Sequence, residues 1–96
     1  MPKFRKKPVV IEAIQFTAEL RDSIVFDGVE CPDGVRRGSS SYNPAERKVW
    51  HAYFYIYTLG GRMMVDIDDW IITGMKGEHY PCKPDIFAAG YESAWF

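Results

Sequence analysis

The segment from Trp50 to Ile67 places the tightest constraint on the fold, because apolar and polar residues alternate on both sides of Gly60-Gly61. Alternation with a period of two is typical of β-strands that bury one face. A Gly-Gly pair between two such runs predicts a hairpin with a two-residue turn. That register gives a buried face of four apolar side chains, paired as Ile56 with Val65 and Phe54 with Ile67.

The opposite face of the same hairpin carries Tyr53, Tyr55 and Tyr57. A sheet face that only meets water ordinarily carries smaller polar side chains. Large amphipathic rings are instead enriched at protein interfaces, and they also stack on nucleic-acid bases. The alternative is that a helix or the C-terminal pair Trp95-Phe96 covers the row and makes it part of the core. The sequence leaves these two interpretations open.

The N-terminal part of the chain predicts one strand and one helix. Val9 to Phe16 is rich in β-branched residues and apolar on both faces, which is typical of a central strand. Thr17 is an expected N-cap for a short helix from Ala18 to Phe26, since its hydroxyl can accept a hydrogen bond from a free backbone N–H. Asp27-Gly28 predicts the end of that helix, because glycine adopts the left-handed conformation readily.

The C-terminal part predicts shorter elements. Trp70 to Thr73 and Glu78 to Pro81 read as strands, and Lys83-Pro84-Asp85 opens a helix that ends near Gly90. We therefore expect an α+β fold: a small antiparallel sheet built around the β-hairpin, with one or two short helices.

Residues 32–48 predict a long, basic, Ser-rich loop. They contain two Pro, two Gly and three consecutive Ser, and they show no periodicity. Such a long stretch without secondary structure is uncommon in a small domain and is often functional. Arg36 and Arg37 are its candidate binding residues, because exposed charges steer the encounter with a partner.

Length and composition narrow the class of protein. The chain of 96 residues leaves no room for two cores, so we expect residues 1–96 to form a single domain. A net charge of -1 gives no general support for nucleic-acid binding. No apolar run is long enough to span a bilayer, and none follows the N-terminal charges as in a signal peptide. With only two cysteines, Cys31 and Cys82, we expect free thiols in a reducing compartment.

His79 and Cys82 form the only spacing that suggests a metal or nucleophilic site. A zinc site needs four ligands, and the other soft candidates, Cys31 and His51, are isolated in the sequence. A Cys–His nucleophile would also need a third residue to orient the histidine, and none is evident. We therefore expect no enzyme activity, no metal and no cofactor, and Cys82 is more simply a small packed side chain.

The acidic residues Asp66, Asp68 and Asp69 favour a turn over a calcium loop, because they lack the further oxygen ligands and the internal glycine. Glu12 lies within an apolar strand. It either pairs with a cation such as Lys76 or Lys83, or reaches solvent at a strand edge.

Two stretches, Lys3 to Phe16 (KFRKKPVVIEAIQF) and Trp70 to Glu92 (WIITGMKGEHYPCKPDIFAAGYE), resemble small, mostly uncharacterised proteins of tailed bacteriophages and prophages near the family named for its PGDYG motif. The string YPCKPDIF, Tyr80 to Phe87, is the most specific part. Ile67 to Trp70 stands where similar proteins carry a Pro-Gly-Asp-Tyr turn, so the proline and glycine are replaced. The resemblance implies a phage or prophage origin and a role in the cytoplasm of the bacterial host, and it supplies no catalytic residues.

We expect a binding module: a phage accessory protein that contacts a bacterial or phage protein, for example to inhibit a defence or regulatory factor. The expected site consists of Tyr53, Tyr55 and Tyr57 with Arg36 and Arg37. One alternative is a small nucleic-acid-binding protein that uses the same tyrosines and the basic loop. Another is a self-associating structural protein, since an aromatic sheet face can pair with its own copy in a homodimer.

Overall fold

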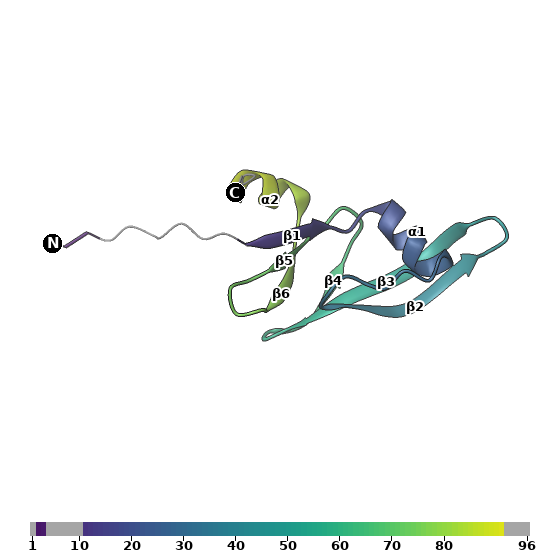
Figure 1. Cartoon of the computed structure of the whole chain (residues 1–96), viewed down its shortest axis with the longest axis horizontal. Coiled ribbons are helices and arrows are strands. Elements are labelled where there is room, and N and C mark those ends of the chain that lie inside the picture. The colour runs from purple at the N-terminus through teal and green to yellow at the C-terminus, as the bar shows by residue number, and fades with distance from the viewer. Residues whose placement is uncertain (1, 4–10, 92–96) are drawn as a thin grey trace.

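The computed structural model describes residues 2–3 and 11–91. Its strands form two antiparallel sheets of three strands, with the orders β1-β5-β6 and β2-β3-β4. The expected α+β class with short helices is confirmed, and the strands divide between two sheets (Figure 1). The elements are β1 (Glu12–Gln15), α1 (Ala18–Phe26), β2 (Val35–Asn43), β3 (Lys48–Thr58), β4 (Gly61–Val65), β5 (Trp70–Thr73), β6 (His79–Cys82) and α2 (Pro84–Gly90).

The core lies where the two sheets and α1 meet. Phe16, directly after β1, and Phe54 in β3 are 0% and 1% exposed, and their ring centroids are 4.8 Å apart. Their packing joins the β1–β5–β6 sheet to the β2–β3–β4 sheet. The other buried members of this core come from α1 and four strands: Ile24, Val25, Val35, Ile56, Val65 and Ile71.

Helix α1 begins and ends where the sequence predicts. The Thr17 hydroxyl accepts a hydrogen bond from the Leu20 N–H at 3.1 Å, so it caps the first turn. At the other end Gly28 has a φ of 73°, the left-handed conformation that terminates helices. Ile24 and Val25 are buried, so α1 packs on the β2–β3–β4 sheet through its C-terminal turn.

The β3–β4 hairpin forms, but its predicted register is wrong by two residues. Thr58 pairs with Gly61 and Phe54 with Val65, so Leu59 and Gly60 occupy the turn. Gly61, which directly follows this turn, has a positive φ of 117°. A turn followed by a glycine of positive φ is a common hairpin connection, and it replaces the expected Gly-Gly turn. A shift of two residues preserves which face each side chain takes.

That register changes the membership of the buried face. Phe54, Ile56 and Val65 are buried, as predicted. Ile67 lies beyond the end of β4 and is 37% exposed, so it does not pair with Phe54.

The N-terminal strand is an edge strand, contrary to the central position predicted from its apolar faces. β1 pairs only with β5, and Ile14 is 48% exposed. β5 is the central strand instead. Ile71 packs in the core that the two sheets share, while Ile72 is fully buried outside that core. Val9 and Val10, the start of the predicted strand, lie outside the described residues.

The predicted loop at 32–48 is also wrong, because residues 35–43 form β2. The cause is the second edge of β3, because β4 pairs along only one edge of this eleven-residue strand. The remaining backbone groups of β3 need hydrogen-bond partners, and β2 supplies them despite its poor strand propensity. The pairing is interrupted between Arg37 and Ser40, where Gly38 and Ser39 form a bulge opposite Tyr53.

The C-terminal elements match their predictions. β5 and β6 pair in antiparallel order, and α2 begins with Pro84 in its first turn. The Phe87 ring stacks on Trp70 with centroids 4.2 Å apart, which holds α2 against β5. No helix of the described residues is long and apolar enough to cross a membrane.

Replacing Phe54 tests the packing that joins the sheets. Phe54→Ala removes a fully buried ring from the contact with Phe16, so we expect a loss of about 3–5 kcal/mol in the free energy of unfolding. Urea denaturation measures it. Tyr57→Ala on the exposed face of the same strand is the control, with an expected loss of about 1 kcal/mol or less. Equal losses for both variants would contradict this assignment of the core.

Candidate binding surface

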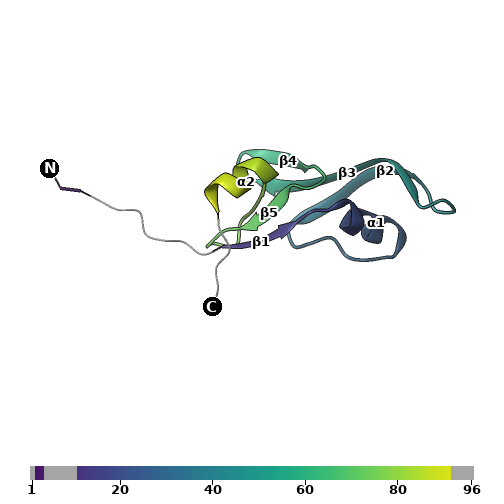
Figure 2. The same ribbon diagram turned by 90° about the horizontal axis from the view of Figure 1, so that it is seen from above.

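One face of the β2–β3–β4 sheet has none of the described helices or strands packed over it (Figures 1 and 2). In Figures 1 and 2, α1 and β1 lie on the other side of this sheet, and no described helix or strand covers the outer side. Tyr53 and Tyr57 are 38% and 58% exposed on that side. The alternative in which a helix covers the tyrosines is therefore wrong, while Trp95 and Phe96 lie outside the described residues.

Neighbouring strands complete this surface. In the observed register Arg36 of β2 and Met64 of β4 both lie opposite Tyr55, and Arg62 of β4 lies opposite Tyr57. Residues opposite one another in a sheet share a face. We call this surface the tyrosine face, and it consists of Arg36, Tyr53, Tyr55, Tyr57, Arg62 and Met64.

The two arginines of the tyrosine face lie over its rings. Arg62 Cζ is 4.8 Å from the centroid of Tyr55, and Arg36 Cζ is 5.2 Å from that of Tyr57. The Tyr55 and Tyr57 rings meet edge to face, with centroids 5.5 Å apart. Attraction between a guanidinium and the π-electrons of a ring holds both partners in place. The surface is therefore a continuous layer of rings and cations.

No carboxylate neutralises these two cations within the described residues. The ion pairs there involve Arg21, Arg47 and Lys83, and neither Arg36 nor Arg62 takes part in one. The tyrosine face therefore combines aromatic area with two guanidinium groups that are still able to bind a carboxylate or a phosphate.

A hollow of about 430 Å³ opens in the middle of the tyrosine face. The β-bulge at Gly38 and Ser39 forms one side, and the rest is lined by residues of β3 and β4: Tyr53, Phe54, Tyr55, Arg62 and Met64. Gly38 makes room for it. A methyl group at this position would lie 3.2 Å from Tyr53 Cβ and 3.6 Å from the Tyr55 ring. We call this feature the Gly38 hollow.

Arg37 does not belong to the tyrosine face. Because side chains alternate along a strand, it projects from the side opposite to Arg36. Its guanidinium donates to the Ser40 hydroxyl at 3.2 Å and to the Ile24 carbonyl at 3.5 Å. Arg37 therefore braces β2 against the end of α1, and the expectation that both arginines serve one binding site is corrected.

Sequence reasoning missed Arg62, Met64 and Gly38. The first two carried a usable signal, because alternation along β4 places them on the same side as the tyrosines in any register that buries Val65. Gly38 carried none, since its role depends on the bulge and on a strand that the sequence does not predict.

The candidate pair His79 and Cys82 does not form a site. The two side chains leave β6 from opposite faces, because they are three residues apart in a strand. His79 Nδ1 lies 3.1 Å from the Thr73 hydroxyl, and the Cys82 thiol donates to the Lys83 carbonyl. Within the described residues no group of three or more His, Cys, Asp or Glu side chains can hold a metal ion.

The Cys31 thiol lacks the lowered pKa of a reactive cysteine. Cys31 and Cys82 are both free and partly buried. Burial raises the pKa of the Cys31 thiol above its usual value, and the positive charge of Arg37 opposes this shift. A raised pKa lowers the fraction of reactive thiolate, so Cys31 is a packed side chain next to the core.

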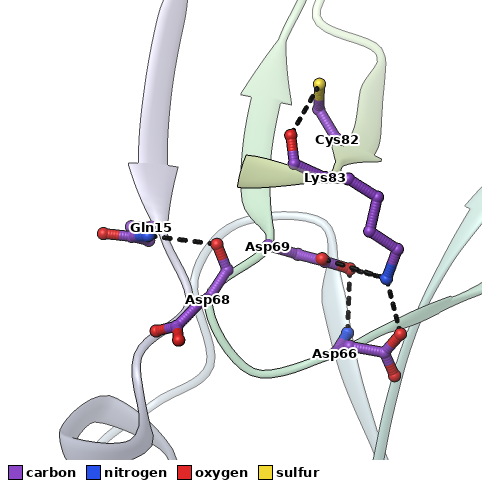
Figure 3. Close-up of polar contacts among 6 residues, drawn as sticks. All are labelled: Gln15, Asp66, Asp68, Asp69, Cys82 and Lys83. Atoms are coloured by element: carbon purple, nitrogen blue, oxygen red, sulfur yellow. Dashed lines mark hydrogen bonds and ion pairs between the residues drawn. The ribbon is translucent and has the colours of Figure 1, made fainter. Parts of the chain in front are cut away.

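The acidic residues between β4 and β5 form a structural ion cluster (Figure 3). Asp69 is 2% exposed and accepts hydrogen bonds from Lys83 Nζ at 3.1 and 3.2 Å and from the Asp66 N–H at 3.0 Å. Lys83 Nζ also donates to Asp66 at 2.6 Å. The hydrogen bonds that Lys83 donates to Asp66 and Asp69 raise the pKa of Lys83 above its usual value. The cluster therefore ties the start of α2 to the β4–β5 turn.

This cluster answers the question of Glu12. Lys83, one of its two conceivable partners, is occupied by Asp66 and Asp69. Glu12 is exposed in the edge strand β1, so it reaches solvent, which is the simpler of the two interpretations.

Comparison with known proteins found no match: no family model, no curated protein and no solved structure matches this chain.

Asp69 and Asp66 provide a matched test of the ion cluster. Asp69→Ala leaves the part-buried Asp66 N–H without its acceptor, so we expect the free energy of unfolding to fall by about 1–3 kcal/mol. Asp66→Ala removes only an exposed partner of Lys83, which is worth about 0–1 kcal/mol. Urea denaturation of both variants measures the difference. A larger loss for Asp66→Ala would show that the exposed pair dominates instead.

Proposed function

We propose that this protein is a binding module that contacts another protein through the tyrosine face. The observation that carries the proposal is an uncovered sheet face with three tyrosines and two arginines that lack a carboxylate partner within the described residues. Tyr, Arg and Met are the residue types enriched at protein interfaces. The guanidinium groups favour a partner whose contact surface is acidic.

The proposed biological setting is that of a phage or prophage accessory protein in the cytoplasm of a bacterial host. In this setting the partner is a bacterial defence or regulatory factor, and occupation of its acidic surface inhibits it. The setting rests on the resemblance to small phage and prophage proteins, and the function rests on the tyrosine face.

Two features of the β4–β5 turn support that resemblance. Asp68, which stands in place of the glycine of the Pro-Gly-Asp-Tyr turn, has a φ of 74°, a conformation that glycine adopts most easily. Asp69, which stands in place of the aspartate, binds Lys83 of the YPCKPDIF string. The turn at 67–70 and the YPCKPDIF string are thus in contact in the fold.

A protein partner fits the tyrosine face better than a nucleic acid does. Rings on a sheet can stack on bases, and arginine can bind phosphate. However, affinity for nucleic acid grows with the number of phosphates that the protein neutralises. The tyrosine face offers two cations. Arg47, which belongs to the basic segment 32–48, is already paired with a carboxylate oxygen of Asp27 at 2.7 Å.

Substitution of the central tyrosine tests the proposal. Full-length protein is immobilised, its partner is captured from a bacterial lysate and identified, and the affinity of the purified pair is measured by calorimetry. Tyr55→Ala is expected to weaken binding by about 2 kcal/mol or more, because it removes a ring at the centre of the face together with its contact to Arg62.

The control is Ile86→Ala, which shortens an exposed apolar side chain on α2, outside the tyrosine face. It should leave the affinity unchanged. Equal effects of the two variants, or a Tyr55→Ala protein that binds normally but melts at a much lower temperature, would contradict the proposal. A complex that forms with single-stranded oligonucleotides and weakens steeply with salt would favour the nucleic-acid alternative.

A further inference from the structure

The Gly38 hollow is built by an irregularity of the backbone. Gly38 and Ser39 both lie opposite Tyr53, so one of them is extra in the ladder between β2 and β3. Such bulges bend a strand and redirect its side chains, and they are frequent next to functional sites. Here the extra residue widens the sheet face beside Tyr53, and the missing side chain of Gly38 leaves the widened space open.

The walls of the hollow have a consistent chemistry. Tyr53 and Tyr55 contribute ring surfaces, and Met64 contributes a flexible thioether that makes favourable contacts with aromatic rings. Aromatic walls of this kind accept another ring edge to face. The volume of about 430 Å³ lies within the range of small-ligand pockets, roughly 300–1,000 Å³.

One cation stands at the hollow. Arg62 lines it, and its Cζ lies over the Tyr55 ring, 4.8 Å from the ring centroid. Since no carboxylate of the described residues pairs with Arg62, its N–H groups are available to a ligand that enters beside the ring. A guanidinium binds a carboxylate through two parallel hydrogen bonds, which fixes its orientation.

We propose that the Gly38 hollow is the anchor site of the interface and takes an aromatic side chain of the partner that has an adjacent Asp or Glu. The ring enters between Tyr53 and Tyr55, and the neighbouring carboxylate pairs with Arg62. This proposal rests on the proposed function, since it names the partner chemistry that the tyrosine face recognises. Interfaces commonly depend on one such ring in a desolvated pocket with a charged pair at its margin.

A second copy of the chain fits the hollow less well. Pairing two tyrosine faces would bring Arg36 and Arg62 of one copy towards the same arginines of the other, without a carboxylate on either face to separate them. Like charges in an interface disfavour association. Charge therefore selects an acidic partner over self-pairing.

Short peptides test the hollow directly. ¹⁵N-labelled full-length protein is titrated with acetyl-Glu-Trp-Glu-amide and followed by NMR. We expect saturable shifts of the Gly38 and Ser39 amide signals. The uncharged acetyl-Gln-Trp-Gln-amide and the ringless acetyl-Glu-Ala-Glu-amide should each bind at least about tenfold more weakly, because each lacks one of the two contacts.

Three variants localise the contacts. Arg62→Gln keeps the length of the side chain and removes its charge, so it should abolish the preference for Glu-Trp-Glu over Gln-Trp-Gln. Ser39→Trp places a bulky ring at the exposed rim and should abolish peptide binding, while an unchanged melting temperature shows that the fold is intact. Gly38→Ala is a second variant that fills the hollow, because the added methyl group would lie against the Tyr53 side chain.

The possible results separate this inference from the proposed function. Equal affinity for the three peptides, or shifts that avoid Gly38 and Ser39, would overturn the anchor site. Partner capture that survives Ser39→Trp and fails with Tyr55→Ala would also overturn it, while the proposed function would stand. Capture unaffected by either variant would overturn both. Displacement of the peptide by oligothymidylate at lower concentration would assign the hollow to a nucleic acid.

Discussion

The contact between Phe16 and Phe54 is the interaction on which the rest of the structure depends. Phe16 directly follows β1, and its backbone is bound to the β4–β5 turn: its N–H donates to the Asp69 carbonyl at 2.8 Å, and its carbonyl accepts from the Asp68 N–H at 2.6 Å. Its ring then packs on Phe54 of the other sheet. The next residue, Thr17, caps α1. Phe16 thus joins the two sheets and sets the position of α1, the helix that contributes Ile24 and Val25 to the core.

The same contact supports the proposed binding surface, the tyrosine face, from the buried side of β3. Phe54 lies between Tyr53 and Tyr55 in β3, with its side chain on the buried face. A strand held rigidly by its inner side chains presents its outer ones in a defined arrangement, so the rings lose little conformational entropy when a partner binds. The tyrosine face is therefore preorganised by the core.

Local signals in the sequence were sufficient for several elements. The cap of α1, its end at Gly28, the helix beginning at Pro84 and the alternation in β3 all depend on residues close together in the chain. Alternation also placed the three tyrosines on one face, and this survived the two-residue error in register because the period of a strand is two.

What the sequence did not reveal depends on partners far away in the chain. β2 is Ser-rich and has no alternation, and it becomes a strand because β3 offers it unpaired backbone groups. Arg37 was assigned to the same surface as Arg36 because residues 32–48 were predicted to form a loop, where neighbouring side chains are not divided between two faces. In a strand, neighbouring side chains point to opposite faces of the sheet. The buried Asp69 likewise gained its role only from Lys83, which approaches from the start of α2.

The arrangement of arginines on β2 and β4 also bears on solubility. These are the two edge strands of their sheet, and exposed edges with unpaired backbone groups are where sheets of different molecules join and aggregate. Arg36 and Arg37 charge one edge, which the bulge at Gly38 also makes irregular, and Arg62 charges the other. The arginines of the proposed binding surface thus also oppose edge-to-edge pairing of this aromatic sheet with other sheets.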